Sequence, residues 1–256
     1  MSPRAAWRGI LLIGSLLFCA LRFQGTRLIA FFQGRQVTAR QRAEWMHFCG
    51  RVVLAAMGIH YRVEGDPPAG STLIVANHLS YLDIVIASAA LPCAFVAKRE
   101  IGSWLFFGPL SKIGGAIFVD RASRASAWDA ADRMALRLAD GVPVVLFPEG
   151  TSTDGREVTR FHSTLFAPAI EGPLPVTPAA IFYERIGTGT ERDLCWFGDE
   201  SFLPHLLRVL EVDGFTAVVR FGPSEVFPDR QTAAWRSHDA VAAMRSDGAQ
   251  LTCQRP

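Results

Sequence analysis

Residues 73–83 read LIVANHLSYLD and place a short apolar run directly before a polar turn and a second apolar segment. The run Leu73–Ala76 is uninterrupted, as is typical of a buried strand in a sheet covered on both faces. Ser80 and Asp83 match the capping pattern that begins a helix, with Ser80 as the N-cap and Asp83 at position N3. The stretch therefore predicts a strand, a polar turn and a helix in succession.

The same alternation continues from about residue 59 towards the C-terminus. Helix-like segments lie at about 81–90, 101–111 and 124–140, and 231–245 reads as one more weakly amphipathic helix. Repeated alternation favours right-handed crossovers, and therefore an α/β fold with a largely parallel sheet flanked by helices. The expected strands cover 60–64, 72–76, 94–97, 116–120, 142–147, 176–183 and 216–221.

The first 62 residues differ from the rest in charge and hydropathy. They hold nine arginines and one acid, Glu44, so they carry +8 in a chain of net charge +2. The uncharged run 9–21 would form a helix of about 20 Å, too short for about 30 Å of bilayer hydrocarbon. A second apolar patch at 28–32 follows the break at 24–27, so we expect a helical hairpin inserted into one leaflet.

Two alternatives to this membrane segment arise from the same residues. A secretory signal peptide fits the basic start and the apolar run, but 19–23 offers no small-x-small cleavage site. The basic charge also fits high arginine usage throughout the chain, whereas nucleic-acid binding is disfavoured because no nucleic-acid motif follows. We expect 1–58 to be a membrane-associated helical segment and 59–256 to be one α/β domain.

Composition excludes several classes of protein. With 50% hydrophobic and 20% charged residues, the chain can bury a large core and is not disordered. The five cysteines form no CxxC and no close pair, so we expect reduced thiols and no zinc site. There is no G-x-S-x-G, GxxxxGK[ST], HExxH or GxGxxG motif, which disfavours serine hydrolases, P-loop proteins, zinc proteases and dinucleotide enzymes.

The polar turn after residues 73–76 holds a candidate acid–base pair. His78 and Asp83 are five residues apart, about 140° around a continuous helix, so a contact between them needs a turn. With a helix beginning at Ser80, a first-turn carboxylate could hold the His78 Nδ1–H and leave Nε2 as a base. Alternatively, Asp83 only caps the helix and His78 is a partly buried loop residue.

Two further strand ends carry polar residues. Residues 147–152, FPEGTS, place the Glu149 carboxylate and several backbone N–H groups at the edge where the strand 142–147 ends. Residues 114–121, GGAIFVDR, end in Arg121, a cation able to hold a phosphate. Taken singly, the first fits an ordinary tight turn and the second a surface arginine beside Asp120. In open α/β sheets, however, sites collect at the carboxyl ends of strands.

Four motifs in this order resemble the glycerophospholipid acyltransferase family, which includes bacterial 1-acyl-glycerol-3-phosphate acyltransferases. The resemblance covers about residues 50–220 and implies acyl transfer from an acyl-CoA or acyl-carrier-protein thioester to a lysophospholipid hydroxyl, with no bound cofactor or metal. The first expectation for the acceptor is lysophosphatidic acid, which would become phosphatidic acid. The matching segments are Asn77-His78-x4-Asp83, 116–121, 147–151 and 174–178, and Lys98 stands where the family commonly carries a basic residue.

The resemblance also implies a role for each matching residue. His78 would be the general base that deprotonates the acceptor hydroxyl, and Asp83 would orient it. Because the nucleophile belongs to the substrate, no acyl-enzyme is needed. Thioester donors are made in the cytosol, so the site would face the cytoplasmic side of the inner membrane. The acceptor would be held through its phosphate by Arg121 and through its glycerol end by Glu149, Gly150 and Thr151.

One position departs from the family pattern. The third motif usually continues Phe-Pro-Glu-Gly-Thr-Arg, and here Ser152 stands in place of the arginine, with Arg156 and Arg160 nearby. Relatives that acylate lyso-ornithine lipid vary at the same place. The resemblance therefore leaves lyso-ornithine lipid as an alternative acceptor, and a catalytically silent lysolipid-binding membrane protein as the non-enzyme alternative.

Overall fold

A twisted sheet of the expected kind forms the centre of the molecule. The computed structural model describes residues 2–103, 107–120 and 124–253. Seven strands in the described residues take the order β1-β7-β6-β2-β5-β3-β4, and every neighbouring pair is parallel except β6 with β7. Their bounds are β1 Ile59–Glu64, β2 Leu73–Ala76, β3 Ala94–Lys98, β4 Ile117–Val119, β5 Val144–Leu146, β6 Val176–Arg185 and β7 Phe215–Phe221.

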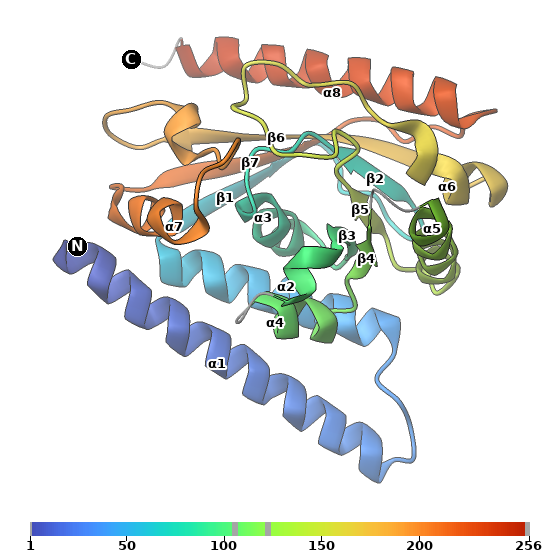
Figure 1. Cartoon of the computed structure of the whole chain (residues 1–256), viewed down its shortest axis with the longest axis horizontal. Helices are drawn as coiled ribbons and strands as arrows, with labels where there is room; N and C mark the ends of the chain where they lie inside the picture. Colours follow the sequence, from blue (N-terminus) through green and yellow to red (C-terminus); the bar gives the residue numbers. More distant parts are fainter. Residues whose placement is uncertain (1, 104–106, 121–123, 254–256) are drawn as a thin grey trace.

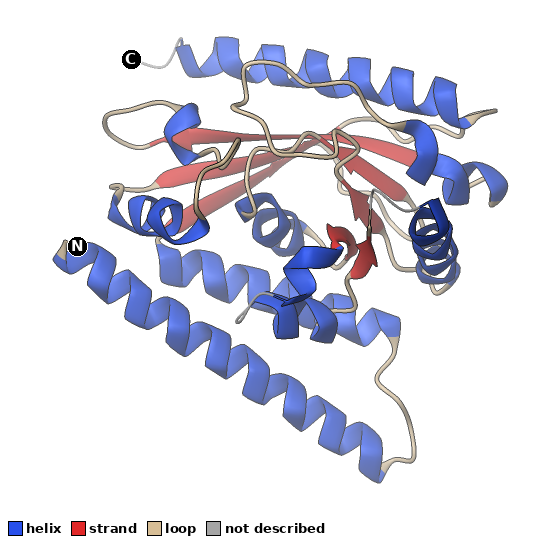
Figure 2. Ribbon diagram, viewed as in Figure 1, coloured by secondary structure: helices blue, strands red, loops and turns tan. Residues whose placement is uncertain are grey.

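Helices cover both faces of this sheet (Figures 1 and 2). One face is covered by α2 Ala39–Met57, α3 Leu82–Ala90 and α7 Phe202–Glu211, and helix α1 Pro3–Phe32 packs on the outside of α2 and α7. The other packs on α5 Arg124–Ala139, α6 Ala167–Glu171 and α8 Arg230–Cys253. A short α4, Phe107–Ile113, follows the 3-10 helix Arg99–Ser103, and two more 3-10 turns span Ser163–Phe166 and Glu191–Leu194.

Alternation along the strands explains the two cores. In β2, Ile74 and Ala76 belong to the core beneath α3, whereas Leu73 and Val75 belong to the core beneath α5 and α8. Successive side chains of a strand point to opposite faces, so a wholly apolar strand is buried on both. The α/β class and the largely parallel sheet that the sequence predicts are confirmed, with all seven expected strands present. The helices α6 and α7 were not expected.

The helix α3 begins later than the sequence predicts. Its first residue is Leu82, and its N-cap is Tyr81 rather than Ser80, with no capping hydrogen bond from the Tyr81 side chain. Asp83 nevertheless accepts hydrogen bonds from the backbone N–H groups of Leu79 and Ser80, at 2.7 and 3.0 Å. The expected capping carboxylate is therefore present, and it binds backbone N–H groups in the turn before the helix.

The N-terminal segment is one continuous helix, and the expected hairpin is wrong. Helix α1 runs through the predicted break at 24–27 and is about 45 Å long at 1.5 Å per residue. Its buried residues, including Leu12, Cys19 and Phe23, lie on one face against α2 and α7. Phe23 packs on Trp45 with ring centroids 5.1 Å apart, and Trp45 Nε1 donates to Cys19 O at 2.9 Å. This packing outweighs the weak helix propensity of Gly25.

Arg8 ties the start of α1 to the end of α7. Its Nη1 donates to Leu210 O at 3.2 Å and to Val212 O at 2.6 Å, and its Nη2 donates to Asp213 O at 3.3 Å. These carbonyls lie where helix α7 ends, so a cation there also suits the helix dipole. The guanidinium rests on Gly58, whose φ of 71° ends α2 one residue before β1. The N-terminal helix is thus held to the α/β region at its first turns.

We expect Arg8→Met to lower the free energy of unfolding by about 1–3 kcal/mol, because two partly buried carbonyls and one exposed carbonyl lose a charged donor. Urea denaturation of the full chain measures it. The matched control is Arg4→Met, which removes the exposed ion pair with Asp213 and an exposed hydrogen bond to Glu211 O, and should cost about 0–1 kcal/mol. An equal loss of unfolding free energy in the two variants would contradict the assignment of Arg8 as the residue that holds α1 to α7.

Candidate active site

The structure brings His78 and Asp83 together at the carboxyl end of β2. His78 Nδ1 lies 2.8 Å from Asp83 Oδ2, across the turn that precedes α3. The Asp83 side chain is fully buried, while 17% of the His78 side chain is exposed. The turn therefore brings the two side chains into contact, and His78 Nε2 lies on the side of the ring away from the carboxylate.

Asp83 has hydrogen-bond donors at both carboxylate oxygens. Oδ2 accepts from the backbone N–H groups of Leu79 and Ser80 as well as facing His78. Oδ1 accepts a short hydrogen bond from Tyr183 Oη, which comes from β6. A buried carboxylate needs such compensation, because burial of an unpaired charge is costly. Tyr183 was missed by sequence reasoning, since it lies in the regular alternation of a strand and no motif marks it.

Asn77 joins the end of β2 to β6. Its Nδ2 donates to Ile181 O at 2.9 Å, and its Oδ1 accepts from Ile181 N at 2.8 Å. The side-chain amide thus makes the two hydrogen bonds, one donated and one accepted, that a backbone residue makes with its partner in a sheet. It does so at the point where β2 ends. This link holds the residue directly before His78 against the strand that carries Tyr183.

Glu149 lies beneath the His78 turn and is almost fully buried. Its Oε1 accepts from His78 N at 2.6 Å, and its Oε2 accepts from Thr159 N at 2.8 Å and Thr159 Oγ1 at 2.7 Å. Burial raises the pKa of the Glu149 carboxyl, although these hydrogen bonds oppose the shift. Both oxygens are therefore engaged with the protein's own loops, and Glu149 also lines a cavity next to His78.

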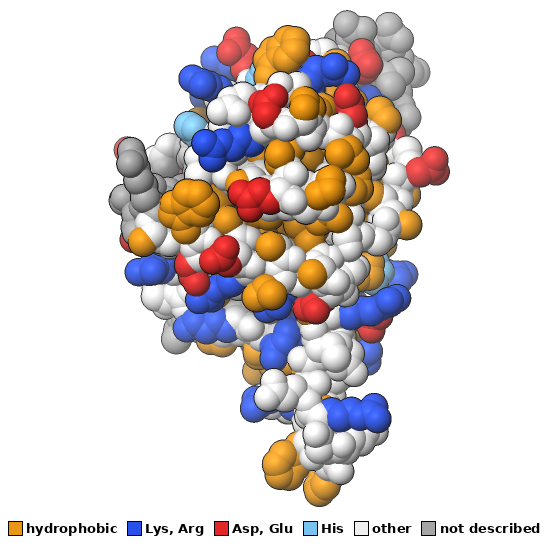
Figure 3. Space-filling view, turned by 90° about the vertical axis from the view of Figure 1, so that its right-hand side faces the viewer, with side chains coloured by type: hydrophobic (Ala, Val, Ile, Leu, Met, Phe, Trp, Pro, Cys, Tyr) orange, Lys and Arg blue, Asp and Glu red, His pale blue; other side chains and the backbone are white. Residues whose placement is uncertain are grey.

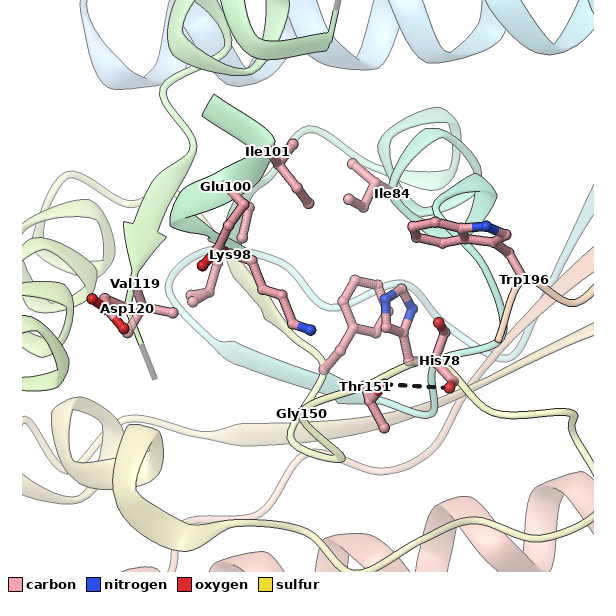
Figure 4. Close-up of a pocket in the computed structure, with 14 residues that line it drawn as sticks. His78, Ile84, Lys98, Glu100, Ile101, Val119, Asp120, Gly150, Thr151 and Trp196 are labelled. Atoms are coloured by element: carbon pink, nitrogen blue, oxygen red, sulfur yellow. Dashed lines mark hydrogen bonds between the residues drawn. The ribbon is translucent and has the colours of Figure 1, made fainter. Parts of the chain in front are cut away.

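His78 opens onto a cavity of about 450 Å³ (Figure 4). Its ring stacks on Phe147, with centroids 4.3 Å apart and planes inclined by 18°. Gly150 and Thr151 line this cavity and also a second one of about 400 Å³, which shares the Phe147 wall. The two cavities therefore adjoin at the Pro-Glu-Gly turn. The first is mainly apolar, and its other walls come from Ile84, Val96, Ile101, Val119 and Trp196.

The charged residues at this cavity are mixed in sign. Lys98, at the end of β3, extends into the cavity (Figure 4), and Glu100 and Asp120 also line it. Ser152 lines it too, in the position where the sequence pattern expects arginine. Arg121 lies outside the described residues. Arg156 is paired with Asp154 at 3.3 Å, and neither Arg156 nor Arg160 is among the described residues that line the two cavities.

Comparison with known proteins assigns a family to this arrangement. A family model described as Acyltransferase matches residues 59–182. A lyso-ornithine lipid O-acyltransferase from Rhodobacter capsulatus is 35% identical over 202 residues, which cover 75% of this chain and 72% of that protein. A 1-acyl-sn-glycerol-3-phosphate acyltransferase from Neisseria meningitidis is 30% identical over 208 residues, covering 79% and 81%.

A solved structure shares the fold. The crystal structure of the 1-acyl-sn-glycerophosphate acyltransferase PlsC from Thermotoga maritima superposes with a TM-score of 0.62 at 20% identity, covering 94% of this chain and 97% of that one. The residues that the family model matches include His78, Asp83 and the 147–151 turn, which lie together at one edge of the sheet. The chain therefore belongs to the acyltransferase family.

Proposed function

We propose that this protein transfers a fatty acyl group from a thioester to the free hydroxyl of a lysolipid. The observation that carries the proposal is the His78–Asp83 pair: a buried carboxylate holds Nδ1 at 2.8 Å, while the imidazole lines the cavity. This geometry fixes the tautomer with the proton on Nδ1, so Nε2 is an acceptor facing the substrate. A protein that only bound lysolipid would need neither the buried charge nor its orientation.

The proposed reaction needs no covalent enzyme intermediate. Nε2 of His78 takes the proton of the acceptor hydroxyl as its oxygen attacks the thioester carbonyl carbon. The carbon–sulfur bond breaks, the new ester forms, and His78 returns the proton to the departing thiolate. Asp83 stabilises the imidazolium between the two proton transfers. Coenzyme A and the acyl carrier protein are the two donors that we expect, and both remain predictions.

The Pro-Glu-Gly turn supports this reaction in two ways. Gly150 and Thr151 lie between the two cavities, where acceptor and donor would meet, which supports the acceptor contacts implied by the resemblance. In our proposal Glu149, which lines the second cavity, helps to position the glycerol end of the acceptor, and its carboxylate also holds His78 N and Thr159. The turn and the catalytic loop are thereby fixed to one another.

Two acceptors have support. Lysophosphatidic acid is the expectation from the sequence, and the matching Neisseria relative carries that specificity in its name. Lyso-ornithine lipid is favoured by the names of relatives from Rhodobacter capsulatus and Brucella abortus, at 35% and 34% identity. Ser152 also favours it, because an arginine that would pair with a phosphate is replaced. A zwitterionic headgroup further suits a cavity lined by Lys98, Glu100 and Asp120.

We also propose that the protein lies on one leaflet of the inner membrane, with its site on the cytoplasmic face. Helix α1 is the one helix in the described residues that is long and apolar enough to cross a membrane. In its most apolar stretch of 18 residues, only 17% of the residues are buried. Packing against α2 and α7 along its length favours a helix lying along the domain. Phe31 and Phe32, at the C-terminal end of α1, are exposed, and Arg27 and Arg35 lie near them in the sequence. This end of α1 lies at the bottom of Figure 1, and Figure 3 shows hydrophobic and basic side chains there.

The first test concerns the catalytic pair. We expect His78→Ala to reduce acyl transfer by about 10²–10⁴-fold with little loss of stability, because a general base contributes that much. Asp83→Asn should fall by a similar factor and also lose stability, since Asp83 binds two backbone N–H groups. Release of thiol from purified acyl-CoA or acyl-carrier-protein donors measures the rate. More than about a tenth of wild-type activity in His78→Ala would show that His78 is not the base.

The acceptor is decided by kcat/KM for lysophosphatidic acid and lyso-ornithine lipid. Ser152→Arg adds a cation beside the cavity, so it should leave lysophosphatidic acid turnover equal or improved and should reduce turnover of lyso-ornithine lipid. Arg121→Ala should raise KM for lysophosphatidic acid if Arg121 binds its phosphate. A wild type that prefers lyso-ornithine lipid, together with an Arg121→Ala variant of unchanged kinetics, would overturn lysophosphatidic acid as the acceptor.

The membrane surface is tested by changing the outward face of α1 without touching its packed face. The double variant Leu17→Glu, Leu21→Glu alters side chains that are 60% and 71% exposed, and it should abolish flotation with anionic phospholipid vesicles. The matched control is Leu136→Glu, Trp235→Glu, at 61% and 63% exposure on α5 and α8, which should still float. Protease protection of the N-terminus and the α/β domain on opposite sides of a sealed membrane would contradict the one-leaflet arrangement.

A further inference from the structure

Tyr183 is buried in the sheet and contacts Asp83 of the catalytic pair. It lies on β6, is 3% exposed, and donates from Oη to Asp83 Oδ1. The lining of neither cavity includes it, so it is placed to contact Asp83 and not a substrate. Burial, followed by the charge of Asp83 and the hydrogen bond to it, raises the pKa of Tyr183 well above its usual value, so the phenol stays protonated and remains a donor.

The donors around Asp83 are unevenly divided between its two oxygens. Oδ2 meets His78 Nδ1 at 2.8 Å, Leu79 N at 2.7 Å and Ser80 N at 3.0 Å, whereas Oδ1 has one donor among the described residues, Tyr183. The torsion that turns an aspartate carboxylate about its own axis is broad and weakly restrained. Without a donor at Oδ1, the carboxylate would lower its free energy by rotating, because the three donors at Oδ2 would then be shared between both oxygens. Its hydrogen bond with His78 would weaken as a result.

The backbone of Tyr183 is held in place by a mostly buried ion pair, Glu191 with Arg245. Tyr183 N donates to Glu191 Oε1 at 2.9 Å, and its ring packs on Phe215 with centroids 5.2 Å apart. Arg245, from α8, binds both oxygens of Glu191 at 2.8 Å. The same guanidinium donates to Ile181 O at 2.9 Å and to Gly155 O. Strand β6 and the loop after the Pro-Glu-Gly turn are thus fixed by one bidentate pair that is mostly buried.

We propose that Tyr183 is a positioning residue of this enzyme: its hydroxyl fixes the plane of the Asp83 carboxylate so that Oδ2 stays directed at His78 Nδ1. The role rests on the proposed acyl transfer through His78. Tyr183 touches neither substrate nor the reacting atoms, and acts through Asp83. A purely packing role would need only the ring, whereas this role needs the hydroxyl.

The test deletes the hydroxyl and keeps the ring. We expect Tyr183→Phe to lower kcat by about 10–100-fold, the loss expected for one hydrogen bond to a charged group, while KM for the acceptor stays near the wild-type value. The matched control is Tyr81→Phe, which removes another buried phenol hydroxyl, bonded to His205 Nδ1 at 3.0 Å, and should leave kcat nearly unchanged. Thermal unfolding of both variants separates the catalytic effect from a loss of stability.

A second measurement reads the hydrogen bond without turnover. In proton NMR of the full chain in micelles, the His78 Nδ1 proton gives a downfield signal that is identified by its loss in His78→Ala. We expect this signal to shift or broaden in Tyr183→Phe and to be retained in Tyr81→Phe. An unchanged signal in Tyr183→Phe overturns the inference, and so does a kcat loss no larger than that of Tyr81→Phe. If the wild type acylates no lysolipid, the proposed function fails while the NMR comparison still decides the role of Tyr183.

Discussion

The fully buried carboxylate of Asp83 is the constraint on which the rest of the site depends. An ionised group removed from water is tolerated only when its oxygens meet donors, and here they meet two backbone N–H groups, an imidazole and a phenol. The donors come from the turn after β2 and from β6, so the carboxylate joins segments that are 100 residues apart. The hydrogen bond between Asp83 Oδ2 and His78 Nδ1 also directs the ring of His78 towards the cavity.

The order of strands makes this assembly possible. β2 lies between β5 and β6, so the turn after β2 has the Pro-Glu-Gly turn on one side and Tyr183 on the other. Asn77 and Glu149 then tie the three segments together through hydrogen bonds to backbone groups. The carboxyl ends of parallel neighbours meet at the same edge, which is why sites in such sheets collect there. The loop that holds His78 and Asp83 is therefore tied by hydrogen bonds to the segments on both sides of it.

The N-terminal helices are part of the same packed structure. Val53 and Leu54 of α2 and Ala5 and Leu12 of α1 belong to the core beneath the sheet, and Arg8 binds the carbonyls at the end of α7. A helix so held on one face and apolar on the other would bring the cavity to a fixed height above a membrane. The proposed enzyme would then meet a lipid acceptor without releasing it into water.

The sequence by itself determined the α/β class and the seven strands, because short apolar runs separated by turns are local patterns. It left the contact between His78 and Asp83 open, since spacing alone also fits an aspartate that only caps the helix. It also determined the family, since four motifs occur in order. Only the tertiary structure decided that α1 is one helix, that Glu149 holds the His78 backbone, and that Tyr183 completes Asp83. Each of these depends on contacts between residues far apart in the chain, where packing outweighs propensity and a buried partner has no signature of its own.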